Sequence, residues 1–410
     1  MKGTAIALFC MPENGHFQRM RPLVAGLAAE GLDVHVMTHR KFRAAVQEDG
    51  GRFFDLFGKY SLEHLSDDSL PVPSRFVTYA AAYAEPICRE VQEIGARLVI
   101  HDSFALVGRL VSLLLDIPRV NVCAGHNVTP EIFVPLLRKD PRVRTSAECL
   151  RAVQTLRNVF GLADASPFAY LSPPSPQLNI CCEPPEFFND AERKAWEPVA
   201  FFGSMRGSGT GDRAASTAAD PVGFAGRGGD VVKAYVSFGT VVWRYYADTA
   251  LQALGTLADA FGDRDDMQAV ISLGGAEPGR AARAGLSRRN VRVENYVDQQ
   301  ELLGQADLFV THHGMNSTHE AIAHEVPMVS YPFFWDQPEL ARKCRQLNLA
   351  IPLTGTVRGD FTRSDVDRAL DLLRSRSELM KSALSRARAW EEGVVANRAA
   401  VVRRIIQLVG

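Results

Sequence analysis

Cysteine is scarce in this chain and follows neither of its usual structural patterns. The 410 residues include seven cysteines, an odd number, and Cys181 and Cys182 are adjacent. This distribution gives no framework of paired disulfides and no pair of C-x-x-C motifs of the kind that binds zinc. We therefore expect a reduced protein located in the cytoplasm.

Long apolar runs and a strong charge of one sign are missing as well. The formal net charge is -1, with 23% charged and 46% hydrophobic residues, and no stretch reaches the ~18 apolar residues of a membrane helix. The apolar run near the amino terminus lacks a small-residue cleavage site, so it fits a buried strand better than a signal peptide. We expect neither a nucleic-acid partner nor a transmembrane segment.

The length and the order of apolar segments predict two α/β domains. A single core rarely grows beyond ~250 to 300 residues, and this chain has 410. Residues 4–38 and 97–124 alternate between strand and helix patterns in the manner of a doubly wound sheet. The alternation restarts at residue 234. We expect residues 1–203 to form one Rossmann-like domain and residues 231–392 another.

The remaining segments are less regular. Residues 204–230 are small, polar and glycine-rich, which favours a linker between the domains, with a surface loop inside one domain as the alternative. Residues 50–90 and 126–195 contain many prolines and aromatics, so loops and short helices are expected there. Residues 393–410 have the pattern of a terminal amphipathic helix.

The most informative stretch is residues 309–337, which read FVTHHGMNSTHEAIAHEVPMVSYPFFWDQ. An apolar strand ends at His312, Gly314 supplies a turn, and a helix follows that ends before Pro327. A helix that begins directly after a strand and a glycine turn presents free backbone N–H groups and the positive end of its dipole. This pattern predicts a phosphate site.

Polar residues at both ends of this stretch extend the predicted site. Ser317 and Glu320 match the S-x-x-E capping box, so we expect Asn316 or Ser317 to cap the helix. Asp336 and Gln337 end the next strand and should face the same cavity. Diphosphate at the helix end and sugar hydroxyls at the acid and amide would suit a nucleotide-sugar.

A zinc motif is the competing interpretation of this stretch, because His319 and Glu320 are followed by His324. Five residues on a helix correspond to about 500°, so the two imidazoles point about 140° apart, whereas the H-E-x-x-H motif requires a spacing of four. We expect no metal.

The stretch resembles the donor-binding signature of the UDP-sugar-dependent glycosyltransferases, an inverting family that includes bacterial natural-product and macrolide-type enzymes. Family members carry five polar residues at offsets of 4, 5, 8, 24 and 25 after a phosphate-binding His, and His312 is followed at these offsets by Asn316, Ser317, Glu320, Asp336 and Gln337. The resemblance implies the GT-B fold, in which two Rossmann-like domains face each other across a cleft and the terminal helix packs back on the first domain.

Two loops that precede this signature in the sequence also resemble loops of the same family. YVSFGT at residues 235–240 is similar to its phosphate-binding glycine turn, and residues 296–299 are similar to its nucleobase loop, with Tyr for Trp and Asp298 for Pro. The expected donor-binding residues of these turns are Gly239, Thr240, Tyr296, Val297 and Gln299. His313 also departs from the family, and its side chain is expected either to help neutralise the diphosphate or to point outward. Trp335 replaces a small residue and either narrows the sugar pocket or packs into the core.

The resemblance implies that His16 is the catalytic base and Asp102 its supporting carboxylate. His16 is expected in the turn between the first strand and its helix, within a sequence similar to the family's opening motif. Asp102 closes an apolar strand, and its alternative role is that of a helix cap or turn residue. His101 should point to the opposite face of the strand.

The implied function is inverting, metal-independent transfer of a sugar from UDP or TDP to a hydroxyl of a small hydrophobic natural product, as a bacterial antibiotic-tailoring step. No cofactor is expected besides the nucleotide-sugar co-substrate. The alternatives are a nucleotide-sugar epimerase of the same fold and a sugar-nucleotide-binding auxiliary protein with an idle catalytic dyad. The sequence leaves open the sugar, the acceptor, the choice between UDP and TDP, and a homodimeric state.

Overall fold

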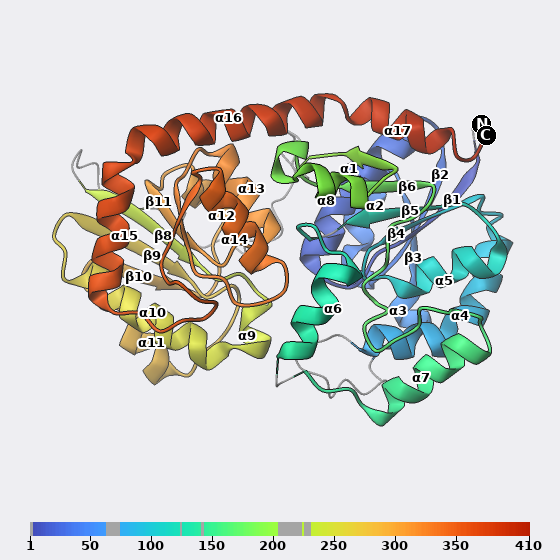
Figure 1. The fold of residues 1–410 in the computed structure, drawn as a ribbon, viewed down its shortest axis with the longest axis horizontal. Helices are drawn as coiled ribbons and strands as arrows, with labels where there is room; N and C mark the ends of the chain where they lie inside the picture. The colour runs from blue at the N-terminus through green and yellow to red at the C-terminus, as the bar shows by residue number, and fades with distance from the viewer. Residues whose placement is uncertain (1–2, 63–73, 124, 141–142, 204–223, 225–230) are drawn as a thin grey trace. The chain divides into compact units, whose positions relative to one another are not determined.

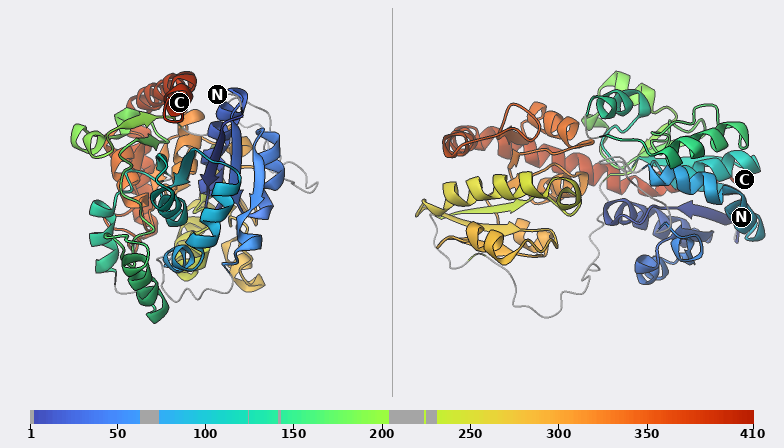
Figure 2. Two further views of the ribbon diagram at one scale, coloured as in Figure 1. Left: turned by 90° about the vertical axis from the view of Figure 1, so that its right-hand side faces the viewer. Right: turned by 90° about the horizontal axis from the view of Figure 1, so that it is seen from below.

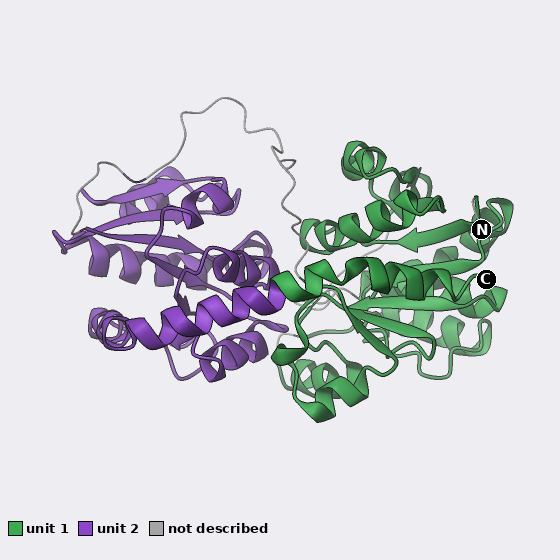
Figure 3. Cartoon of the chain, turned by 90° about the horizontal axis from the view of Figure 1, so that it is seen from above, with its two compact units in different colours: residues 1–208, 392–410 green, residues 209–391 purple. Residues whose placement is uncertain are grey.

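The computed structural model describes residues 3–62, 74–123, 125–140, 143–203, 224 and 231–410. The chain divides into two compact units, one formed by Met1–Ser208 and Glu392–Gly410 and the other by Gly209–Glu391 (Figure 3). Helices flank the parallel sheet of each unit (Figures 1 and 2). The predicted α/β class with two doubly wound sheets is confirmed. The predicted domain limits stay predictions, because the expected linker at 204–230 lies outside the described residues apart from Phe224.

The described part of the first unit contains a seven-stranded parallel sheet in the order β3-β2-β1-β4-β5-β6-β7. Its strands are β1 (Ala5–Phe9), β2 (Asp33–Thr38), β3 (Arg52–Asp55), β4 (Leu98–Asp102), β5 (Arg119–Cys123), β6 (Leu178–Cys181) and β7 (Val199–Phe201). Strands β1 and β4 are buried at every residue, as their apolar sequences require in a sheet covered on both faces.

Helices of the first unit connect these strands. They are α1 (Asn14–Ala29), η1 (Arg40–Phe42), α2 (Arg43–Glu48), α3 (Leu56–Lys59), α4 (Arg75–Glu93), α5 (Leu106–Leu115), α6 (Pro130–Lys139), α7 (Ala147–Asn158), η2 (Pro185–Phe187) and α8 (Asp190–Ala195). Loops and short helices were expected for residues 50–90, and this was wrong for the 19-residue helix α4. It continues through Pro86, and its buried face includes Tyr79, Ile87 and Val91.

The second unit repeats the plan with a six-stranded parallel sheet in the order β10-β9-β8-β11-β12-β13 among its described residues. Its strands are β8 (Val232–Ser237), β9 (Met267–Ser272), β10 (Val291–Glu294), β11 (Leu308–Thr311), β12 (Met328–Ser330) and β13 (Ala350–Pro352). Its helices are α9 (Val242–Tyr245), α10 (Ala247–Gly262), α11 (Arg280–Leu286), α12 (Gln299–Leu303), α13 (Met315–Ala323), α14 (Gln337–Gln346) and α15 (Arg363–Ser375).

The carboxyl-terminal helices belong to both units. Helix α16 (Ser377–Ala396) begins in the second unit and ends in the first, and α17 (Arg398–Ile406) packs on α1 (Figure 1). The contact is close, since a Cβ at Gly26 would lie 2.9 Å from Val402 Cγ2. Val401, Val402 and Ile405 are buried there. None of the helices in the described residues is both long and apolar enough to cross a membrane.

Candidate active site

The two sheets share one topological feature that positions the predicted site residues. In the first sheet the order runs outward from β1 to β3 and resumes on the other side of β1 with β4, and in the second sheet β8 and β11 stand in the same relation. Ligands of open α/β sheets bind beyond the carboxyl ends of the strands at such a point. The chain places His16 after β1 and Asp102 at the end of β4, with Gly239 after β8 and His312 after β11.

His16 and Asp102 are in direct contact. His16 Nδ1 lies 3.1 Å from Asp102 Oδ1, and the side chains are 14% and 0% exposed. The backbone N–H of Met11 donates to Asp102 Oδ2 at 3.1 Å, and that of Phe104 donates to Oδ1 at 2.7 Å. The carboxylate is therefore held by fixed donors, and His16 keeps Nε2 for another partner.

The position of His16 differs from the expectation in one respect. It is the third residue of helix α1, which begins at Asn14, rather than a residue of the turn before the helix. The N-cap residue is Glu13, which makes no side-chain cap and is not a residue type that marks a helix start. The imidazole is fixed by a helix backbone instead of a loop.

The surroundings of His16 and Asp102 shift both pKa values. Burial disfavours the imidazolium, but the Asp102 carboxylate and its hydrogen bond outweigh this effect and raise the pKa of His16 above its usual value. Burial also disfavours the Asp102 carboxylate, but His16 and the N–H donors of Phe104 and Met11 outweigh it and lower the pKa of Asp102. Such an imidazole is suited to accept a proton.

Neighbouring residues complete the end of β4. The His101 ring is buried beside the carbonyl oxygen of Asp102, 3.0 Å from its Nδ1, and a Cβ at Gly108 of α5 would lie 2.8 Å from His101 Cβ. Burial lowers the pKa of His101 to about 4. Phe104, which was not predicted, lies with its ring centroid 4.8 Å from that of His16. Its N–H bond to Asp102 is an Asx turn, so Asp102 is a turn residue and contacts His16 at the same time, while its catalytic role stays a prediction.

His312 lies against two glycines that leave no room for a side chain. A Cβ at Gly239 would lie 2.7 Å from His312 Nε2, and a Cβ at Gly314 would be closer still. Gly239 also has φ +71°, a conformation that favours glycine. Both positions therefore require glycine, and the predicted His312, Gly239 and Gly314 are brought together.

The electrostatics of His312 are opposite to those of His16. Burial lowers the pKa of His312 to about 4, and the backbone of Ser237 opposes this effect only in part. The imidazole is therefore neutral near pH 7. A neutral imidazole can donate one hydrogen bond to an anion without carrying a buried charge.

Helix α13 begins next to this histidine, but its cap was predicted wrongly. The N-cap is Gly314, which has no side chain, and the helix starts at Met315. Ser317 is thus the third residue of the helix and Glu320 the sixth, so they form no capping box. The half-buried Asn316 is the second residue. No side-chain cap covers this helix start, and a helix N-terminus of this kind favours an anion.

Ser317 and Glu320 instead take part in a network with Gln299. Gln299 Nε2 donates to Ser317 Oγ at 3.2 Å and to Glu320 Oε2 at 2.6 Å, and Gln299 Oε1 accepts from Tyr235 OH at 3.1 Å. These bonds join β8, α12 and α13. They indicate that Gln299 fixes the position of the helix, and its predicted binding of the donor stays a prediction.

The predicted nucleobase loop precedes α12. Tyr296 is 67% exposed and Val297 is buried. Asp298 caps α12, because its Oδ1 accepts from the N–H groups of Gln300 and Glu301 at 3.0 and 3.2 Å. The helix cap therefore explains why this chain has aspartate where the family has proline.

Asp336 and Gln337, the predicted sugar-binding pair, have different surroundings. Gln337 Oε1 accepts from the backbone N–H groups of Phe333 and Phe334 at 2.9 and 3.2 Å, so its oxygen is committed to the loop. Asp336 is the N-cap residue of α14 but makes no side-chain cap. Trp335 adopts φ +55° and packs edge-on against Phe334, with ring centroids 5.5 Å apart. This contact places the indole partly in the core.

His313 takes neither of the two predicted positions. Its ring is fully buried, with Nδ1 3.1 Å from Thr318 Oγ1 and Nε2 2.7 Å from Ser330 Oγ. Burial lowers its pKa to about 3. His313 therefore braces the turn from inside, whereas the predicted Thr240 is exposed.

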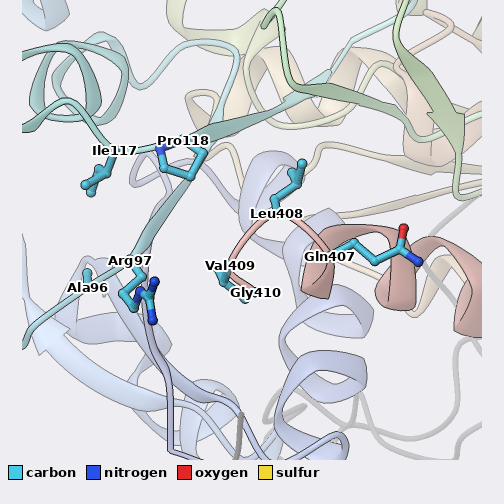
Figure 4. Close-up of a pocket in the computed structure, with 8 residues that line it drawn as sticks. All are labelled: Ala96, Arg97, Ile117, Pro118, Gln407, Leu408, Val409 and Gly410. Carbon is cyan, nitrogen blue, oxygen red and sulfur yellow. The ribbon is translucent and has the colours of Figure 1, made fainter.

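A cavity of about 320 Å³ lies elsewhere in the first unit, lined by residues 96–97, 117–118 and 407–410 (Figure 4). Residues 96–97 and 117–118 precede β4 and β5, so the cavity is at the amino ends of these strands. It therefore lies at the opposite edge of the sheet from Asp102. Among the residues that the structure describes, no group of three or more His, Cys, Asp or Glu is arranged to hold a metal ion.

Comparison with known proteins identifies relatives of both units. The family model described as "UDP-glucoronosyl and UDP-glucosyl transferase" matches residues 217–382, which contain all the donor-side residues above. NDP-glycosyltransferase YjiC of Bacillus subtilis (strain 168) is 23% identical over 409 residues, which cover 98% of this chain and 96% of that protein.

Solved structures match the entire chain. The glycotransferase of kitacinnamycin superposes with a TM-score of 0.73 at 21% identity, covering 100% of both chains. CalG4, the calicheamicin glycosyltransferase, superposes with a TM-score of 0.71 at 18% identity, covering 100% of this chain and 99% of that one. These similarities show the shared fold.

Proposed function

We propose that this chain, which shares its fold with GT-B glycosyltransferases, transfers a sugar from a nucleotide donor to a hydroxyl of a small hydrophobic natural product, with inversion at the anomeric carbon. The observation that carries the proposal is the 3.1 Å contact between His16 and Asp102. An oriented imidazole with a raised pKa at the carboxyl edge of a sheet supports the role of a general base.

The first unit would activate the acceptor. His16 Nε2 takes the proton of the acceptor hydroxyl as its oxygen attacks the anomeric carbon. The new C–O bond forms as the bond to the diphosphate oxygen breaks, and the diphosphate leaves with the electron pair. Direct displacement inverts the anomeric configuration. Asp102 stabilises the imidazolium that forms and fixes the ring tautomer.

The second unit would hold the leaving group. The uncapped N–H groups of α13 and a hydrogen bond from neutral His312 stabilise the diphosphate, and Thr240 lies on the glycine turn nearby. Tyr296, with 67% of its surface exposed, would stack on the nucleobase. Asp336 would accept hydrogen bonds from the sugar hydroxyls.

We propose that this reaction needs no divalent metal, because the helix end and His312 supply the stabilisation that Mg²⁺ supplies in other transferases. Activity should therefore persist in EDTA. Loss of activity on chelation, with recovery on adding Mg²⁺ or Mn²⁺, would contradict this part of the proposal.

The donor and acceptor classes are also part of the proposal. The family match favours a UDP-sugar, and a TDP-sugar is the alternative. Fold neighbours named for kitacinnamycin and calicheamicin favour a small natural product as acceptor and an antibiotic-tailoring step. A cytoplasmic location and a homodimeric state stay predictions.

The test is to incubate the protein with UDP- and TDP-sugars and a panel of hydroxylated natural products, and to determine the anomeric configuration of the product by NMR. The expected product has the configuration opposite to that of the donor. Conversion of the donor to an isomer without acceptor would identify an epimerase. Donor binding without turnover over the panel would identify an auxiliary protein.

A further inference from the structure

Helix α13, which carries the proposed diphosphate site, and the turn that follows it contact α16 through two side-chain pairs. His319 Nδ1 lies 2.5 Å from Glu391 Oε1, and these side chains are 1% and 9% exposed. Arg388 Nη1 lies 3.6 Å from Glu325 Oε1, with exposures of 48% and 33%. Arg388 and Glu391 are three residues apart on α16 and therefore lie on one face of the helix.

The two pairs differ in what they can contribute. An exposed pair such as Arg388–Glu325 is screened by solvent and has little effect on stability. The buried His319–Glu391 pair loses hydration at both partners, and apolar residues of similar size would stabilise the same contact at least as well. The contribution of this pair to the free energy of unfolding therefore does not explain why it is there. A role in defining the position of α13 on α16 does.

The position of the buried pair connects it to the reaction. His319 is the fifth residue of α13, one turn beyond the N–H groups that face the diphosphate. Glu391 is the last residue of the second unit, and α16 continues without a break into the first unit.

The next helix then makes bonds to the sheet of the first unit. In α17, Arg398 Nε donates to Phe202 O at 2.9 Å, and Arg404 Nη1 donates to Val199 O at 2.6 Å, at the end and the start of β7. The His319–Glu391 contact, the continuous helix α16 and the hydrogen bonds of α17 to Phe202 and Val199 thus follow one another along the chain.

We propose that His319 and Glu391 are positioning residues that couple diphosphate binding at α13 to α16 and, through it, to the unit that carries His16. The proposal rests on the proposed function for the role of α13. It also gives a use to a histidine whose sequence context, HEAIAH, does not fit zinc. The pair acts on the transfer step, so its loss should lower kcat more than donor affinity.

The test compares His319→Gln, Glu391→Gln and the double variant with Arg388→Gln, the matched control from the exposed pair. We expect each single variant to lower kcat by about tenfold to a hundredfold, as small displacements of reacting groups do, with the Kd for UDP or TDP nearly unchanged. The double variant should be no worse than the more affected single variant. Arg388→Gln should retain the wild-type rate.

A second readout does not require turnover. Adding UDP or TDP should slow hydrogen exchange of α17 amides in the wild type and in Arg388→Gln, and this response should be absent in Glu391→Gln. Additive single-variant effects, equal losses in kcat and nucleotide affinity, or an unchanged exchange response would overturn the coupling. So would a failure of both buried-pair variants to fold, which would show a purely structural pair.

The two readouts separate this inference from the proposed function. If the wild type transfers sugar while its α17 exchange ignores the nucleotide, the coupling alone is wrong. If the exchange response depends on Glu391 but no acceptor is glycosylated, the coupling holds and the proposed reaction is wrong. If neither nucleotide binds the wild type, both fail.

Discussion

His16 and His312 occupy equivalent places in the two sheets, yet their surroundings give them opposite properties. Each follows a strand at the point where the strand order reverses. Asp102 raises the pKa of His16, whereas burial lowers that of His312 to about 4. A carboxylate makes one histidine basic, and a pocket of bare backbone keeps the other neutral. The fold thus sets where a side chain acts, and its neighbours set what it can do.

The strongest test of this comparison is His16→Ala. Removing the general base should lower kcat by about 10² to 10⁴-fold while leaving the Kd for the nucleotide unchanged, because nucleotide binding is assigned to the second unit. The control is His35→Ala, which removes another His–Asp contact of 3.1 Å, to Asp33, from the same sheet. Equal loss in both variants, measured by steady-state kinetics, would contradict a special role for His16.

The corresponding change at the other histidine is His312→Ala, which should weaken binding of the nucleoside diphosphate whether or not a sugar is attached. The loss of one hydrogen bond to a charged group corresponds to about 1.5 to 3 kcal/mol. Calorimetry with UDP and with the nucleotide-sugar measures it. If only the intact nucleotide-sugar were affected, His312 would belong to the sugar subsite.

Asp336→Ala should show the reverse selectivity. We expect affinity for the nucleotide-sugar to fall by about 1 to 3 kcal/mol, because sugar hydroxyls would lose their acceptor, while affinity for bare UDP or TDP stays nearly unchanged. Calorimetry with both ligands checks this. An equal loss for the two would place Asp336 outside the sugar subsite.

Gly239→Ala tests the backbone pocket of His312 without changing the histidine. The new Cβ would lie 2.7 Å from Nε2, and φ +71° strains an alanine, so nucleotide affinity should fall by about tenfold as the ring is displaced. Gly255→Ala is the control, because it adds a Cβ on helix α10 with nothing within 4 Å. Comparable affinity losses in the two variants would contradict the claim that Gly239 holds the His312 ring in place for the nucleotide.

Asp102→Asn should have its clearest effect on the pH profile. The proposed base His16 would be active only when neutral, so the rate should fall as pH drops through its raised pKa. Removing the carboxylate lowers that pKa, and the acid limb of kcat/KM should move to lower pH together with a reduced plateau. An unchanged profile would leave Asp102 as a turn residue only.

The sequence predicted the two-sheet architecture and the glycine turns at Gly239 and Gly314, because strand periodicity and fixed spacings are local signals. It failed where a local pattern had a competing use. Ser317 and Glu320 match a capping box, but Gly314 already ends the turn, so the helix starts earlier and both side chains bind Gln299.

Other features depend on contacts between distant segments and leave no local signal. Helix α4 continues through Pro86 because its buried face packs on α5 and α7, which outweighs the lost hydrogen bond. The inward orientation of His313 depends on Ser330 of β12. Periodicity and spacing contain no information about such partners.

Helix α17 has a practical consequence for protein engineering. It follows the second unit in the sequence but packs on α1, where Gly26 allows Val402 to approach closely. Consider a chimera that joins the first unit of this chain to the second unit of a relative. If its carboxyl-terminal residues also came from the relative, helix α1 would lose the α17 surface on which it packs here. The exchange should therefore retain residues 392–410 of this chain, so that the crossover points lie on both sides of the transplanted segment.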